Sequence, residues 1–285
     1  MMRLNEPLYS FEQTIDECVT GITGNTALRN KLTSSKDDLT EAEAQYLAAA
    51  GTGELHIIPP ISTDHDSDPL VINTLLKSEL VKIYEQYFVD KKKPARKIYD
   101  ALLNAAEEKC PFCGGIGTPR TLDHFLPKSH FPQFSVLPLN LVPSCRDCNM
   151  DDKGHAFATN AEDQIIHPYA DNDRFFLAQW IFAIYHVGIN GNAGEFQYYV
   201  SSPEEWSAVD KQRALKHFED FNLAKRYATK AAGRLGTILQ QLKHMKQKGV
   251  DDEIRCGHLR IGADAAPFAN HWQKGMYQAL LQELE

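Results

Sequence analysis

No run of apolar residues in this 285-residue chain approaches the roughly 20 needed to cross a bilayer. The most apolar stretch, Phe175 to Tyr185, is short and is interrupted by Gln179. Residues 1–21 also lack a cationic start followed by an apolar segment, so a secretory signal is not expected. These absences predict a cytoplasmic protein that does not insert into a membrane.

Excess positive charge is also missing, because the formal net charge is −8. Residues 1–70 hold 4 Lys/Arg and 12 Asp/Glu, which accounts for all of it; residues 71–285 hold 26 of each sign. Long-range attraction of the whole chain to phosphates is therefore weak. A nucleic-acid-binding role would need a local basic surface, for which Lys91–Lys97 and the segment 223–248 are candidates, or a partner protein.

Cysteine is scarce, and four of the six cysteines form two C-x-x-C pairs, Cys110/Cys113 and Cys145/Cys148. In a cytoplasmic protein such pairs indicate metal binding rather than disulfides. Four thiolates suit a tetrahedral zinc ion and leave no open coordination position, so the predicted zinc is structural. A redox role for one pair is the weaker alternative, since no thioredoxin-like pattern surrounds it.

Most of the remaining chain has helical periodicity. Helices are expected near residues 9–20 and 41–50, along 70–88, after Pro94, over 174–186, from Pro203, over 223–248 and over 266–284, with a strand at 195–200. The turn-rich stretch 51–68 is expected to be a linker. The predicted fold is α+β, a mainly helical body with a small metal-held unit. Its regions are an acidic accessory segment (1–68), a lead-in with the cysteine region (69–172) and a helical C-terminal region (173–285).

An acid–histidine pair lies between the two cysteine pairs, in Thr121-Leu122-Asp123-His124-Phe125-Leu126-Pro127-Lys128. Asn140-Leu141-Val142-Pro143 leads into the second pair, and Asn149 follows Cys148 directly. A neutral imidazole can take a proton from water near pH 7. A carboxylate with an amide oxygen suits Mg²⁺. These residue types are ones that metal-assisted hydrolysis uses.

This order of residues resembles the HNH endonuclease family, whose zinc-knuckle members show C-x-x-C, Asp-His, Asn-Leu and a second C-x-x-C followed by Asn or His. The likeness covers about residues 110–169. It implies a ββα-metal unit that hydrolyses DNA with a bound Mg²⁺ or Mn²⁺. It also implies that His124 is the general base, that Asp123 and Asn149 are cation ligands, and that Asn140 holds the His124 loop in place.

Nucleic-acid contacts are also expected from Lys128, Arg146 and Lys153, although Lys153 departs from the family's spacing: it lies four residues after Asn149, where three is usual. Asp151 and Asp152 are an alternative source of cation ligands. His167-Pro168-Tyr169 is expected either to close the rim of the site or simply to pack.

Within the family, the segments around Cys110, Asp123, Asn140 and His167 most resemble the nuclease subunit of Septu-type anti-phage systems, which works beside an ATPase. That likeness implies an antiviral nuclease with an ATPase partner. Two alternatives stay open: a toxin-like or RNA-directed nuclease with the same site, and a non-catalytic zinc module that binds nucleic acid.

Overall fold

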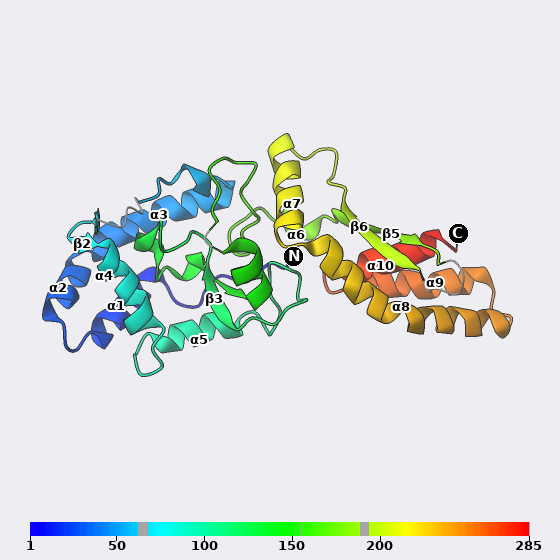
Figure 1. The fold of residues 1–285 in the computed structure, drawn as a ribbon, viewed down its shortest axis with the longest axis horizontal. Helices are drawn as coiled ribbons and strands as arrows, with labels where there is room; N and C mark the ends of the chain where they lie inside the picture. Colours follow the sequence, from blue (N-terminus) through cyan, green and yellow to red (C-terminus); the bar gives the residue numbers. More distant parts are fainter. Residues whose placement is uncertain (62–67, 155, 189–193, 285) are drawn as a thin grey trace. The chain divides into compact units, whose positions relative to one another are not determined.

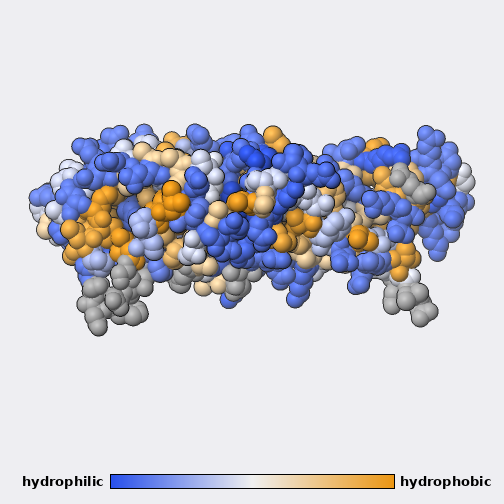
Figure 2. Space-filling view, turned by 90° about the horizontal axis from the view of Figure 1, so that it is seen from above, coloured by the Kyte–Doolittle hydropathy of each residue, from blue (hydrophilic) through white to orange (hydrophobic). Residues whose placement is uncertain are grey.

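The computed structural model describes residues 1–61, 68–154, 156–188 and 194–284 (Figure 1). Helices make up most of the described chain, and three two-stranded antiparallel sheets accompany them. The fold is therefore α+β, as predicted. No helix in the described ranges combines the length and the apolar character that a membrane span requires. On the face shown in Figure 2, hydrophilic residues prevail and hydrophobic ones form separate patches.

The chain divides into two compact units. The N-terminal unit comprises residues 3–111 and 117–171, and the C-terminal unit comprises residues 1–2, 112–116 and 172–285. The segment 3–68, predicted to be accessory, thus belongs to the same unit as the Asp123-His124 pair.

Helices dominate the first part of the N-terminal unit. They are α1 (Phe11–Gly21), α2 (Thr26–Ser34), α3 (Lys36–Thr52), α4 (Lys77–Lys82), a π-helix (Ile83–Phe88) and α5 (Arg96–Asn104). Ser10 caps α1 in a capping box with Gln13, so unpaired backbone groups at the first turn are satisfied. Two short strands, β1 (Leu70–Ile72) and β2 (Leu75–Leu76), interrupt the helix expected over 70–88. Asn73, with φ of 47°, turns the chain between them.

The second part of the N-terminal unit holds a hairpin of β3 (Thr121–His124) and β4 (Leu141–Ser144), followed by a π-helix (Asp147–Lys153). The strands pair without a bulge, with Asp123 opposite Val142 and His124 opposite Leu141. Helix α5 packs against both strands. The predicted linker begins inside α3 and continues in a short 3₁₀ turn (Leu55–Ile57), while residues 62–67 of it lie outside the described ranges.

The C-terminal unit contains α6 (Arg174–Leu177), β5 (Ile181–His186), β6 (Glu195–Val200), α7 (Ala208–Asp220), α8 (Leu223–Gln247), α9 (Asp252–Asp264) and α10 (Trp272–Gln282). Helices α10 and α8 pack on the β5–β6 hairpin. The helix expected over 174–186 is wrong, because it ends after one turn and the chain continues as β5. Side chains along β5 alternate between buried and more exposed, as in a half-buried strand.

Candidate active site

His124 is the last residue of β3, and its side chain is 8% exposed. Its Nε2 lies 2.9 Å from the carbonyl oxygen of Ser135. A carbonyl oxygen only accepts hydrogen bonds, so Nε2 carries the proton and Nδ1 keeps its lone pair. Burial lowers the pKa of His124 to about 3. The imidazole is therefore neutral at physiological pH and is held in the tautomer whose Nδ1 carries no proton.

The Tyr84 ring, from the π-helix Ile83–Phe88, packs edge-on against the His124 ring at 4.4 Å between centroids. Burial raises the pKa of the Tyr84 phenol, so this hydroxyl stays protonated. Together with the bond to Ser135, this contact fixes the orientation of the imidazole. Sequence reasoning assigned Tyr84 only to an apolar helix face, because the pairing joins residues 40 positions apart.

Asp123 precedes His124 and is also buried. Lys153 Nζ lies 3.2 Å from Asp123 Oδ2 and donates to the His124 carbonyl oxygen at 2.7 Å. Lys153 is itself buried, and its ammonium group binds groups of the site itself; its expected contact with nucleic acid stays a prediction. Its positive charge offsets that of the carboxylate, and its bond to the backbone holds the end of β3.

A cavity of about 460 Å³ opens beside the end of β3. Asp123, His124 and Asn149 all line it, together with Tyr84 and Lys128. Neighbouring residues of a regular strand point to opposite faces. Both members of the acid–histidine pair reach one cavity because the strand ends at His124. The hairpin and the following π-helix thus gather the three residues that the sequence singled out.

Asn149 is half-buried in the π-helix Asp147–Lys153. Its backbone N–H donates to the Cys145 carbonyl at 3.0 Å, and its Nδ2 donates to Thr121 Oγ1 at 3.0 Å. The amide nitrogen is therefore directed at β3, which leaves the amide oxygen as the atom suited to a cation. A carboxylate and an amide oxygen lining one cavity fit Mg²⁺ or Mn²⁺. The side chains of Asp151 and Asp152 are outside what the structure describes.

Asn140 is fully buried and makes four side-chain hydrogen bonds. Its Oδ1 accepts from Leu126 N at 2.7 Å and from Tyr46 Oη at 3.1 Å. Its Nδ2 donates to the carbonyl oxygens of Leu126 at 3.0 Å and Phe134 at 3.1 Å. Asn140 thus ties both ends of the loop that carries Ser135, and it positions His124 through that loop rather than by direct contact.

Tyr46, on α3, is a second contributor that sequence reasoning missed. Its hydroxyl binds Asn140 Oδ1 and lies 3.0 Å from His167 Nε2. His167 is fully buried, packs against the Phe125 ring at 4.2 Å and does not line the cavity, so it packs rather than forming a rim. Tyr46 has no neighbour in the sequence that marks it as part of the site.

The four paired cysteines gather as predicted: the sulfur atoms of Cys110, Cys113, Cys145 and Cys148 lie within 4.8 Å of one another, and all four residues are buried. This arrangement can hold a metal ion such as zinc. Gly114 follows with φ of +62°, and a Cβ there would meet the Tyr227 hydroxyl at 2.6 Å, so only glycine fits this turn. Cys18 and Cys256 are buried elsewhere.

The remaining cations divide into two groups. Lys128 lines the cavity, where it pairs with Glu85 at 3.1 Å, and Arg146 is exposed but does not line it. In the Lys91–Lys97 cluster, Lys93 donates to the Gly21 carbonyl, and Arg96 and Lys97 pair with Asp100 and Glu17. That cluster is largely engaged by the protein itself.

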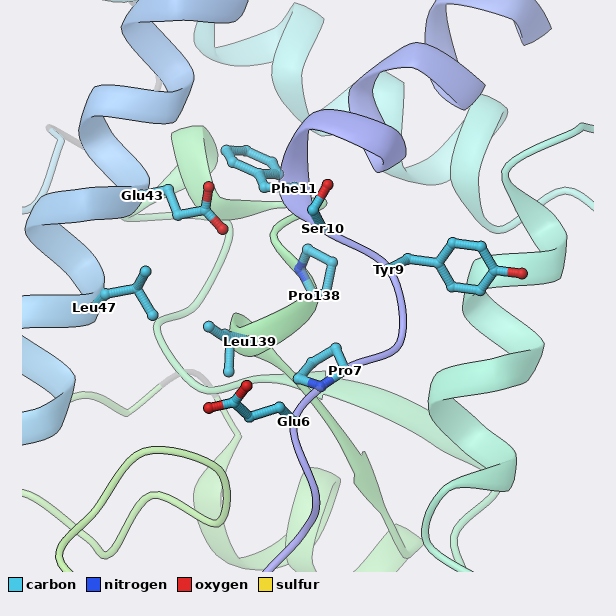
Figure 3. Close-up of a pocket in the computed structure, with 9 residues that line it drawn as sticks. All are labelled: Glu6, Pro7, Tyr9, Ser10, Phe11, Glu43, Leu47, Pro138 and Leu139. Carbon is cyan, nitrogen blue, oxygen red and sulfur yellow. The ribbon is translucent and has the colours of Figure 1, made fainter.

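A second hollow, of about 220 Å³, lies between the N-terminal segment, α3 and the turn at Pro138 (Figure 3). Figure 3 shows Glu6 and Glu43 on either side of Leu139. Burial raises the pKa of Glu43. Its lining holds two carboxyl groups and no cationic side chain, so it is unsuited to an anionic substrate.

Comparison with known proteins identifies a relative over almost the full length of the chain. No protein-family model matches the chain, and no solved structure matches it. Protein ea31 of Escherichia phage lambda is 38% identical over 293 residues, an alignment that covers 98% of this chain and 97% of the relative. With that identity over almost the whole of both sequences, the chain belongs to the same family as Protein ea31 of Escherichia phage lambda.

Proposed function

We propose that the protein is a metal-dependent endonuclease of the HNH type, which hydrolyses phosphodiester bonds in DNA. The observation that carries the proposal is that His124, Asp123 and Asn149 line one cavity beside a regular two-stranded hairpin. A neutral histidine with a fixed tautomer, a carboxylate and an amide are the groups that such hydrolysis requires. The π-helix after the hairpin supplies the third element of the proposed ββα-metal unit.

In the proposed reaction, His124 Nδ1 takes a proton from a water molecule whose oxygen attacks phosphorus. The P–O3′ bond breaks, and the departing oxygen takes up a proton, which leaves 5′-phosphate and 3′-hydroxyl ends. Ser135 and Tyr84 keep the imidazole aimed into the cavity during this transfer. Lys128 provides positive charge at the cavity wall for a neighbouring phosphate.

Asp123 and Asn149 would hold Mg²⁺ or Mn²⁺, and when bound that ion would offset the negative charge of the phosphodiester. The four-cysteine cluster would hold zinc in a purely structural role, because four sulfur ligands leave no position for substrate. Mg²⁺ or Mn²⁺ would thus take part in the reaction, whereas zinc would stabilise the fold.

The test is cleavage of labelled double-stranded DNA, single-stranded DNA and RNA by the full chain with Mg²⁺ or Mn²⁺. The His124→Ala variant should lose cleavage while its zinc content, measured by mass spectrometry, and its circular dichroism stay unchanged. Retained cleavage in that variant would remove His124 as the base. Cleavage of RNA alone would favour the RNA-directed alternative.

Binding of DNA with no cleavage of any substrate would favour the non-catalytic zinc module. Activity that appears only with a co-purified ATPase would support the proposed role in anti-phage defence, in which a partner compensates for the chain's low positive charge. Full activity of the isolated chain would argue against dependence on that partner.

A further inference from the structure

Helix α8, in the C-terminal unit, concentrates positive charge in a chain whose net charge is −8. Between Phe221 and Val250 there is no Asp or Glu. The same stretch holds seven basic residues, which are Lys225, Arg226, Lys230, Arg234, Lys243, Lys246 and Lys248. Local charge of this density attracts phosphate even when the whole protein is acidic.

These charges are available at the surface. All but Arg226 are exposed, and within the described part of the chain none of those six forms an ion pair with a carboxylate. The Lys91–Lys97 cluster differs, because three of its cations bind protein groups. Of the two basic candidates in the sequence, α8 offers the larger number of exposed cations without an ion pair in the described chain, six against Lys91 and Lys92 of the other cluster.

The shape of the exposed face suits an extended anion. Helix α8 packs on β6, where the Tyr227 ring contacts the Tyr198 ring, and its buried face also includes Leu235 and Ile238. At 3.6 residues per turn, Gly233 and Gly236 fall near the middle of the opposite face, with cations along both of its edges. A Cβ added at either glycine would meet nothing within 4 Å. A phosphate backbone can therefore approach this helix closely between two rows of cations.

The same face is poorly suited to other anionic partners. A helix that lies in a membrane needs large apolar side chains beside its cations, and α8 contributes none to the exposed large hydrophobic residues of the described chain. Unpaired bases stack on exposed aromatic rings, but the aromatic residue of α8, Tyr227, is buried. A helix of 25 residues is about 37 Å long, close to one turn of B-DNA.

We propose that the exposed face of α8 binds the sugar–phosphate backbone of duplex nucleic acid, independently of sequence. The choice of nucleic acid as the ligand rests on the proposed nuclease function, whereas the choice of surface rests on the charges, exposure and shape of α8. This face supplies the affinity for phosphate that the composition of the whole chain lacks.

The test compares two triple variants of the full chain that remove equal charge. One is Lys230→Gln/Arg234→Gln/Lys243→Gln on α8; the control is Arg29→Gln/Lys91→Gln/Lys92→Gln, at exposed cations of the N-terminal unit. Binding of a fluorescent 30-base-pair duplex is measured by anisotropy over a range of salt concentrations without divalent cations. Unfolding curves establish that both variants fold.

The α8 variant should bind about tenfold or more weakly, and the slope of log K against log salt should fall by up to about 2.7, or 0.9 for each lost phosphate contact. The control should stay within about twofold of wild type. Equal weakening of both variants, or of neither, would overturn the proposal. Binding to phosphatidylserine vesicles that depends on α8, without duplex binding, would overturn it in favour of a membrane.

The experiments distinguish failure of the proposed α8 binding face from failure of the proposed nuclease function. Duplex binding that depends on α8, without cleavage when Mg²⁺ is added, would contradict the nuclease alone. If the protein cleaves DNA but its duplex binding is unchanged in the α8 variant, only the proposal about α8 is contradicted.

Discussion

Each unit of the molecule contains a buried histidine bound in the same way. His124 in the N-terminal unit and His217 in the C-terminal unit both place Nε2 2.9 Å from a backbone carbonyl oxygen, of Ser135 and Phe112 respectively. Burial lowers the pKa of both to about 3. The two side chains thus share an Nε2 bond to a backbone carbonyl and a pKa lowered by burial.

Their surroundings differ. His124 borders a cavity of about 460 Å³ that Asp123 and Asn149 also line, whereas His217 is 0% exposed and packs against the rings of Phe112 and Phe221. A shifted pKa therefore accompanies burial for purely structural reasons as well as for catalysis. The cavity and the side-chain oxygens that line it, rather than the pKa, distinguish the candidate base.

Replacing each histidine by alanine should separate the two roles most strongly. Both changes should cost about 1–3 kcal/mol of unfolding free energy, since each leaves a buried carbonyl without its donor. Only His124→Ala should lower the cleavage rate, by about 10²–10⁴-fold. Single-turnover cleavage at a temperature where both variants are folded is the measurement. An equal loss of cleavage rate in His217→Ala would contradict the assignment of a catalytic role to His124 alone.

The two units offer a second matched pair, Asn140 and Asn270, which are both fully buried. Asn270 Oδ1 accepts from the backbone of Trp180 and Ile181, and its Nδ2 donates to two carbonyls, so it too makes four hydrogen bonds. Alanine at either position should destabilise the protein by about 2–4 kcal/mol.

Asn140→Ala should also slow cleavage by about tenfold, because the loop that orients His124 loosens and small misplacements are costly in catalysis. Asn270→Ala should leave the rate per folded molecule unchanged. Chemical denaturation and single-turnover rates on the same samples test this. If the single-turnover rate of Asn140→Ala equals that of Asn270→Ala, Asn140 serves folding only.

The smallest expected effect is the change in unfolding free energy as the pH is lowered. Both histidines have folded pKa values near 3, below the unfolded value of 6.5, so between these values the unfolded chain binds more protons. Stability is full above about pH 6.5 and falls as pH drops toward 3, and each histidine contributes about 1 kcal/mol of this loss between pH 7 and 5.5. In urea titrations, His217→Gln should lose about 1 kcal/mol less than wild type over that interval. Identical losses would show that His217 does not take part in acid sensitivity.

Short-range patterns predicted much of the molecule. The spacing of the four cysteines was enough to predict their cluster, and a 25-residue amphipathic pattern was enough for α8. The segment 174–186 was predicted wrongly because its aromatic and aliphatic residues suit either a helix or a strand. Pairing of Ile181 with Val200 and of His186 with Glu195 decides for a strand, and no local pattern contains that partner.

The same reason limits prediction of the site. Asp123 and His124 are adjacent in sequence and were predicted from their residue types and from the resemblance to the HNH family. Tyr84 and Tyr46 reach the site from distant helices, so only the fold reveals them. The burial of Lys153 was equally hidden, because it depends on the π-helix bringing its ammonium group back to the end of β3.

The hydroxyl of Tyr46 ties the acidic first quarter of the chain to Asn140, directly before the second strand of the hairpin. Leu4 N also donates to the Pro168 carbonyl, and Lys31 pairs with Glu79 across 48 positions. Recombination that moved residues 69–171 alone into another gene would leave behind the partner of Asn140 and part of the surrounding core. The helices of the N-terminal unit and the hairpin would therefore have to be transferred together for Asn140 to keep its partner.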